Sequence, residues 1–144
     1  MRNRSRARGW ALQALYAWEQ RGGEASTAIP VLEELFGNLR VSPQNRPYAE
    51  ALVRLVASSL DRIDRMLLDA LTNWRLERLS VIDRAILRLG TAEMLFVDDV
   101  SPRVVIREMV QLAEKYGTAD SPRFVNGVLD AVMRRNAPGQ AADA

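Results

Sequence analysis

The sequence predicts an all-α protein of about seven helices in two small packed bundles. Apolar residues recur with helical spacing along most of the 144 residues, and no segment alternates polar and apolar residues with the period of a strand. Glycine, proline and capping residues interrupt these stripes. We expect one domain over residues 1–136, with an N-terminal bundle over about 5–73, a C-terminal bundle over about 74–135, and a disordered tail over 137–144.

The N-terminus is expected to be an arm followed by a helix. Arginine occupies every second position from Arg2 to Arg8, a spacing that follows no single helical stripe, so the first few residues are predicted to be flexible. A helix then covers about 5–20, and its segment from Trp10 to Trp18 is apolar on nearly all sides, which is typical of a helix buried on more than one face. Gly22-Gly23 is expected to end it.

Two further stripes complete the N-terminal bundle. Apolar spacing predicts helices over about 27–36 and 48–71, and the second is either continuous or bent near Ser58-Ser59. The proline-containing stretch between them reads as a loop. An apolar bridge formed by Trp74, Leu76 and Leu79 is expected to lead into the second bundle.

Capping signals mark two helices of the C-terminal bundle. Ser80 and Asp83 form a predicted capping box before a helix over 81–96. Ser101 is the expected N-cap of the next helix, which covers 102–116. A glycine inside the first of these helices, Gly90, indicates a close crossing with a neighbouring helix.

The last helix is also preceded by residues that typically end one helix and begin the next. Gly117 is expected in the left-handed conformation that ends a helix, and Ser121 is the expected N-cap, followed by Pro122. Asn126-Gly127 lies in the middle of this helix, where glycine costs about 1 kcal/mol relative to alanine. Close packing against another helix would explain it.

Composition argues against most chemistry and points to binding. The chain has no histidine and no cysteine, no P-loop and no GxGxxG motif, so we expect no enzyme, no metal and no cofactor. Residues 1–21 hold five Arg and one Glu, a net charge of +4, whereas the whole chain carries only +2. No apolar run is long enough to span a bilayer. With no cysteine and no signal-peptide pattern, a cytoplasmic location is expected.

Three separated segments carry a resemblance to a known family. They are RSRARGWALQALYAWE near the N-terminus, WRLERLSVIDRAILRLGTAEMLF in the middle, and AEKYGTADSPRFVNGVLDAVMRR near the C-terminus. In order and spacing, from about residue 4 to residue 135, they resemble the NusB family of bacterial transcription antitermination factors. The family's two-bundle helical fold agrees with the predicted pattern.

The resemblance implies an RNA-binding surface. NusB-family proteins bind boxA, a short single-stranded RNA, and an aromatic residue at their RNA-facing corner can stack on a base. By position in this sequence, the implied RNA-binding residues are Arg4, Arg6, Arg8, Arg88, Tyr116, Asp120, Arg123 and Phe124. Asp120 could contact RNA or only cap the last helix. The structural alternatives are a solvated basic tail and an ordinary capped core helix.

The resemblance also implies a protein partner, the small-subunit ribosomal protein NusE. Tyr16, Glu77 and Asp83 lie where family members contact it. A basic ribosomal protein would meet acidic residues favourably. The alternative is that Glu77 and Asp83 are surface and capping charges, and for Asp83 the capping box already gives a sufficient reason.

The expected function is therefore antitermination through assembly. The protein would bind boxA RNA together with NusE and act on the elongating RNA polymerase complex, chiefly in ribosomal RNA transcription. One alternative is an RNA-binding NusB-like module associated with ribosomal RNA methylation, although no second domain or nucleotide-binding loop is present in the 144 residues. The other is a structural homodimeric helical protein, and the sequence leaves monomer and homodimer open.

Overall fold

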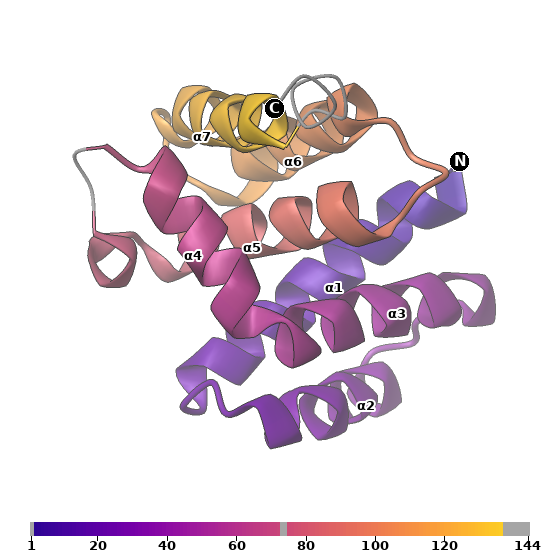
Figure 1. Cartoon of the computed structure of the whole chain (residues 1–144). Helices are drawn as coiled ribbons and strands as arrows, with labels where there is room; N and C mark the ends of the chain where they lie inside the picture. Colours follow the sequence, from indigo (N-terminus) through magenta and orange to yellow (C-terminus); the bar gives the residue numbers. More distant parts are fainter. Residues whose placement is uncertain (1, 73–74, 137–144) are drawn as a thin grey trace. The chain divides into compact units, whose positions relative to one another are not determined.

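The computed structural model describes residues 2–72 and 75–136, and Figure 1 shows the course of the chain. This part of the chain contains seven α-helices and no strand, so the expected all-α fold is confirmed. The α-helices are α1 (Arg2–Gln20), α2 (Ala28–Asn38), α3 (Arg46–Ser58), α4 (Leu60–Ala70), α5 (Val81–Phe96), α6 (Pro102–Tyr116) and α7 (Ser121–Arg135). Three short 3₁₀ helices accompany them: η1 (Ala25–Thr27), η2 (Pro43–Asn45) and η3 (Leu76–Arg78).

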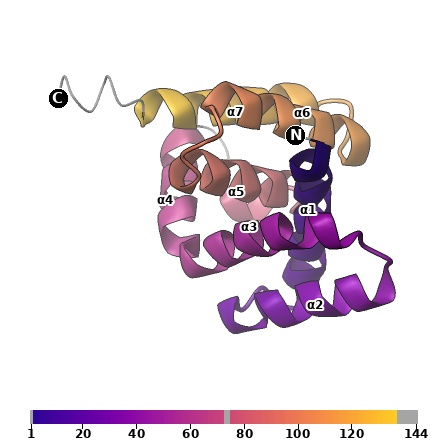
Figure 2. The ribbon, with the colours of Figure 1, turned by 90° about the vertical axis from the view of Figure 1, so that its right-hand side faces the viewer.

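The contacts between elements divide the chain into two compact units, the first ending at Leu60 and the second beginning at Asp61. In the first unit, α1 crosses α2 and α3, which also contact each other (Figure 2). In the second, α5, α6 and α7 contact one another in pairs. Trp74 of the expected apolar bridge lies outside the described residues, whereas Leu76 and Leu79 are buried.

The core of the first unit follows the predicted stripes. Leu15 and Trp18 of α1, Leu32 of α2 and Leu52 of α3 are buried, and burial of each such side chain stabilises the fold by about 1.5–3 kcal/mol. The Trp18 indole N–H donates to the Glu24 carbonyl oxygen at 2.6 Å, so its polar group is satisfied.

The turn after α1 needs its two glycines. Gly22 and Gly23 have φ values of 108° and 68°, in the left-handed region that other residues rarely adopt. The Gly23 N–H donates to the Trp18 carbonyl oxygen at 3.0 Å, which satisfies a carbonyl at the end of the helix. The expected end of this helix is confirmed.

The prediction of a flexible N-terminal arm is wrong, because α1 already begins at Arg2. The guanidinium groups of Arg4 and Arg8 lie 4.5 and 5.7 Å from the centroid of the Tyr48 ring on α3. These cation–π contacts hold the first two turns of α1 against α3. The anchor lies far along the chain, so local spacing carried no sign of it.

An exposed ion pair joins the end of α1 to α2. The Arg21 guanidinium donates to both Glu34 carboxylate oxygens, at 2.7 and 3.0 Å. This hydrogen bonding, together with the charge attraction, lowers the pKa of Glu34. The pair therefore favours the folded state only while Glu34 is ionised, and its contribution falls as the pH drops through that lowered pKa.

The long stripe over residues 48–71 belongs to two helices. α3 ends at Ser58, Ser59 has φ −122° and ψ 23°, and α4 begins at Leu60. The bend near Ser58-Ser59 is therefore the alternative that holds. Pro47 lies in the first turn of α3, where its missing N–H costs no helical hydrogen bond.

In the second unit, Gly90 lies where α5 meets both α6 and α7. A Cβ at this position would come within 2.8 Å of Met109 Cγ and 2.9 Å of Leu129 Cδ1. Only a bare Cα lets the three helices approach this closely, which confirms the expected close crossing at Gly90.

Close packing at Gly127 is not observed. The residue is exposed, and a Cβ there would meet nothing within 4 Å. The buried stripe of α7 consists of Val125, Val128, Leu129 and Val132, and Gly127 points away from it. The packing explanation for this glycine is therefore wrong.

The start of α5 fixes the position of η3. Ser80 is the N-cap, and its hydroxyl accepts from the Asp83 backbone N–H at 3.1 Å, as expected for one half of a capping box. Arg84, almost fully buried, donates to the carbonyl oxygens of Leu76 and Leu79 at 3.2 and 3.3 Å. These bonds tie the segment that carries Glu77 to the first turns of α5.

Candidate nucleic-acid interface

The junction between α6 and α7 depends on Gly117, but not for the predicted reason. Its φ of −93° and ψ of −165° are extended, so the expected left-handed conformation is wrong. A Cβ at Gly117 would lie 2.5 Å from Ser121 Oγ and 2.9 Å from the Ala113 carbonyl oxygen. Glycine is required here because the end of α6 and the start of α7 come so close together.

Ser121 serves this junction and does not cap α7. Its buried hydroxyl accepts from the Thr118 N–H at 3.0 Å and lies 3.3 Å from Thr118 Oγ1. The prediction of Ser121 as N-cap is therefore wrong. Asp120 holds the N-cap position, and its side chain makes no capping hydrogen bond. Helix capping therefore does not explain why position 120 carries an aspartate, whose side chain is exposed.

Four of the candidate residues come together at this junction, and we call them the α6–α7 corner: Tyr116, Asp120, Arg123 and Phe124. Asp120 and Arg123 are exposed, whereas Tyr116 and Phe124 are half-buried. The Lys115 ammonium lies 5.2 Å from the centroid of the Tyr116 ring. Half-buried rings can offer a face for base stacking, and a guanidinium beside the N-terminus of α7 can bind a phosphate.

The three candidate arginines of α1 differ in how much surface they show. Arg8 is only 3% exposed, Arg4 is half-buried over Tyr48, and Arg6 is exposed. Burial and the ring contact give Arg8 a structural role that the sequence did not indicate. Arg6 is the member of this set that the fold presents most openly to a phosphate.

Arg88 is held in an ion pair. Its Nε and Nη2 atoms lie 2.9 Å from Asp64 Oδ1 and Oδ2, a bidentate arrangement that joins α5 to α4. The two side chains are 12% and 22% exposed. The structure thus gives Arg88 a partner within the fold.

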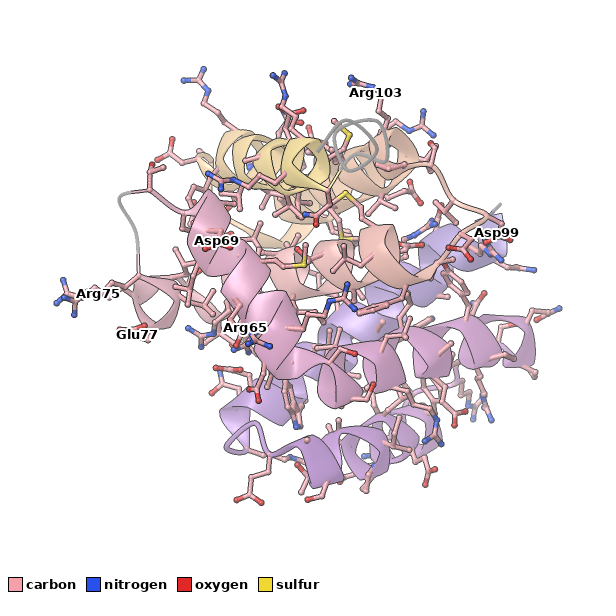
Figure 3. All side chains as sticks on the ribbon, viewed as in Figure 1. Arg65, Asp69, Arg75, Glu77, Asp99 and Arg103 are labelled. Carbon is pink, nitrogen blue, oxygen red and sulfur yellow. The ribbon has the colours of Figure 1, made fainter. Side chains whose placement is uncertain are left out.

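The candidate contacts for a protein partner lie on both units. Tyr16 is 39% exposed on α1. Glu77 is exposed on η3 and projects outward beside Arg75 (Figure 3). Asp83 is half-buried in the first turn of α5, and its Oδ1 atom is buried with no hydrogen-bond partner in the described part of the chain.

Sequence reasoning missed three residues that position the candidates: Tyr48 under Arg4 and Arg8, Asp64 opposite Arg88, and Lys115 beside Tyr116. Tyr48 and Asp64 act across long stretches of chain and leave no local signal. Lys115 could have been noticed, since it is the only lysine in the sequence and directly precedes a candidate aromatic.

Two kinds of feature are absent from the described residues. Residues 2–72 and 75–136 contain no group of three or more acidic, histidine or cysteine side chains that could hold a metal ion. None of the helices in these ranges is long and apolar enough to cross a membrane.

A small all-helical protein that gathers arginine and aromatic side chains at a helix junction fits the class of nucleic-acid-binding helical proteins. Comparison with known proteins gives the family. The model of the NusB family matches residues 5–134. A transcription antitermination protein NusB of a Nitratiruptor species is 42% identical over 135 residues, which cover 93% of this chain and 94% of that protein. The chain belongs to the NusB family.

Solved structures agree with this assignment. NusB of T. maritima superimposes with a TM-score of 0.85 at 35% identity, over 98% of this chain and 97% of that one. A crystal structure of the antitermination factors NusB and NusE in complex with dsRNA superimposes with a TM-score of 0.81 at 31% identity, over 94% of this chain and 98% of the related one.

Proposed function

We propose that this chain is a transcription antitermination factor that binds boxA-type single-stranded RNA together with NusE. It acts on elongating RNA polymerase, chiefly in ribosomal RNA transcription. Support comes from the family match over residues 5–134, from relatives named as transcription antitermination proteins, and from the related NusB–NusE structure with RNA. The protein contributes binding surfaces and no catalytic step, and it works in the cytoplasm.

The α6–α7 corner carries the RNA side of the proposal. Its two rings and Arg123 lie around the start of α7. The Asp120 side chain makes no capping hydrogen bond, so capping does not explain an aspartate at this position. A base stacks on Phe124, with Tyr116 as a second ring, while Arg123 contacts a neighbouring phosphate. Arg6 adds a phosphate contact from α1, with Arg4 in a secondary role.

Two of the implied RNA contacts carry less weight than the others. Arg8 is buried against Tyr48, and Arg88 is paired with Asp64. Recruiting either guanidinium to RNA would first break a contact that stabilises the fold. We therefore assign both residues to positioning α1 and α4.

NusE binds through Tyr16, Glu77 and Asp83 in this proposal. Tyr16 offers an exposed ring, and η3 presents the Glu77 carboxylate to solvent, which suits a basic protein. Asp83 contributes less than Glu77, since one of its carboxylate oxygens is buried. The joint surface of the two proteins then holds RNA more tightly than either one alone.

The test is a titration of the protein against three RNAs, with and without NusE: a boxA-like single strand, a scrambled single strand, and a duplex of the boxA-like sequence. The duplex is included because the related complex contains dsRNA. We expect the boxA-like strand to bind most tightly and its advantage to grow with NusE. If all three RNAs bind equally and NusE makes no difference, the protein binds RNA only through non-specific charge attraction.

A pair of aromatic variants then tests the corner itself. Phe124→Ala should lose about 1–3 kcal/mol of boxA affinity, the range for removing one stacking platform. The matched control is Phe36→Ala, which removes a half-buried ring contacted by Arg46 in the first unit. If Phe124→Ala folds normally and binds RNA as well as the parent, the corner is not the stacking site.

A further inference from the structure

A surface groove runs between α6 and α7, and the RNA and NusE assignments leave most of it unused. Figure 1 and Figure 2 show the two helices side by side, in agreement with their many contacts. The groove is wide open to solvent and is lined by Arg103, Ile106, Arg107 and Val110 of α6 and by Pro122 and Asn126 of α7, among others. Arg123 borders both the groove and the α6–α7 corner.

The rim of this groove is basic and unbalanced. Arg103, Arg107 and Arg123 are exposed, and none of them makes a hydrogen bond or ion pair with another described residue. Arg103 projects from α6 into solvent (Figure 3). Arg103 and Arg107 lie four residues apart on one helix, where like charges repel. An anionic partner would relieve this repulsion.

Among the described lining residues, the one carboxylate does not offset the arginines. Asp130 of α7 is paired with Arg134, whose Nε lies 2.8 Å from Asp130 Oδ2. Because Arg134 already balances the charge of this carboxylate, the positive charges of the three rim guanidinium groups are not compensated.

The floor of the groove decides between two kinds of anionic partner. It is aliphatic, formed by Ile106, Val110 and Pro122, and no aromatic residue among residues 2–72 and 75–136 lines it. Recognition of single-stranded RNA relies on aromatic faces for stacking. An aliphatic floor between basic rims instead suits an amphipathic helix whose apolar face is flanked by acidic residues. Gly127 follows the lining residue Asn126 and is exposed, so no side chain covers α7 at this position.

We propose that the α6–α7 groove binds an acidic amphipathic helical segment of a partner protein, as a second protein-binding site separate from the surface assigned to NusE. The apolar face of the segment covers Ile106, Val110 and Pro122. Its flanking carboxylates meet Arg103 and Arg107 on one side and Arg123 on the other. The site goes beyond the proposed RNA and NusE functions, and Arg123 is the one residue that it shares with the α6–α7 corner.

The probe is a fluorescein-labelled peptide of about 20 residues, long enough to form a helix. It carries leucine at i, i+3, i+4 and i+7 and glutamate at the flanking positions, and a scrambled peptide of equal composition serves as its reference. We expect saturable binding of the amphipathic peptide, with amide chemical-shift changes at Ile106, Arg107 and Asn126. Arg103→Glu/Arg107→Glu should weaken binding by about tenfold.

A charge-matched variant separates the groove from net charge. Arg75→Glu/Arg78→Glu alters two exposed arginines near η3 and shifts the net charge equally. It should weaken the peptide by less than about twofold. Three results would overturn the proposal: no advantage over the scrambled peptide, equal losses in both variants, or RNA rather than peptide shifting the groove amides. The titration of the parent protein with boxA RNA and NusE succeeds or fails independently of the first two results.

Discussion

Two glycines of the second unit lie in opposite environments. Gly90 is buried where α5 meets Met109 and Leu129, and Gly127 is exposed with open space where a Cβ would be. The same residue type is thus a packing requirement at one position and a cost at the other. The stripe of α7 already separates the two cases, since Gly127 lies off the buried positions Val125, Val128 and Leu129.

We predict that alanine has opposite effects at these two positions. Gly127→Ala should stabilise the fold by about 1 kcal/mol, the helix-interior preference for alanine over glycine. Gly90→Ala should destabilise it by about 1–3 kcal/mol, because the new methyl group forces Met109 and Leu129 to move. Urea unfolding of both variants, compared with the parent at equal m-value, measures the difference.

Each glycine variant has its own contrary result. A neutral Gly90→Ala would mean that α6 and α7 can shift to admit a methyl group. A destabilised Gly127→Ala would mean that the exposed face of α7 has a contact that the structure does not show.

At the scale of elements, apolar periodicity predicted where the helices lie, whereas contacts that the sequence pattern does not show changed the expected starts of α1 and α7. α5, α6 and α7 follow their stripes almost as expected. The start of α1 was missed because Arg4 and Arg8 reach Tyr48 on α3. The Ser121 cap was missed because its hydroxyl bonds to Thr118 instead. A serine before a proline reads as a cap in sequence, and only the fold shows a nearer partner.

The candidate site follows the same division. Family resemblance supplied the RNA-binding role of the corner, because the residues alone left an ordinary capped core helix open. Resemblance could not reveal which arginines make contacts within the fold. Arg8 and Arg88 are used internally because Tyr48 and Asp64 happen to lie opposite them in space. Such partners become visible only when the helices are packed.

We predict that the Arg88–Asp64 ion pair contributes substantially to the stability of the contact between α5 and α4. Removing one member leaves the other largely buried without its charge partner, so Asp64→Asn or Arg88→Ala should destabilise the fold by about 2–3 kcal/mol. The double variant should cost less than the sum of the two. A double-mutant cycle by thermal or chemical unfolding measures this coupling.

The control for this pair is Arg54–Glu50 on α3, an exposed i,i+4 ion pair at 2.8 Å. Breaking it should change stability by no more than about 0.5 kcal/mol. Equal effects at the two sites would show that the burial of Arg88 and Asp64 adds nothing to their interaction.

At the scale of the whole molecule, net charge cannot account for RNA binding. The chain carries only +2, because the +4 of residues 1–21 is offset by −2 over the rest. Affinity for a polyanion must therefore come from local gatherings of arginine, and its salt dependence counts the guanidinium groups that meet phosphates. The sequence offers Arg4, Arg6 and Arg8 equally for this role, whereas their burial ranks them.

We predict that the salt dependence of boxA binding distinguishes Arg6 from Arg8. Each phosphate neutralised on a single strand adds about 0.7 to the magnitude of the slope of log K against log salt. Arg6→Ala should reduce that magnitude by about 0.7 and leave stability unchanged, because its side chain is exposed. Arg8→Ala should leave the slope as it is and lower the melting temperature, because its 3% exposed side chain lies over Tyr48. The opposite pattern, a shallower slope for Arg8→Ala at unchanged stability, would mean that the start of α1 opens to release Arg8 to the RNA.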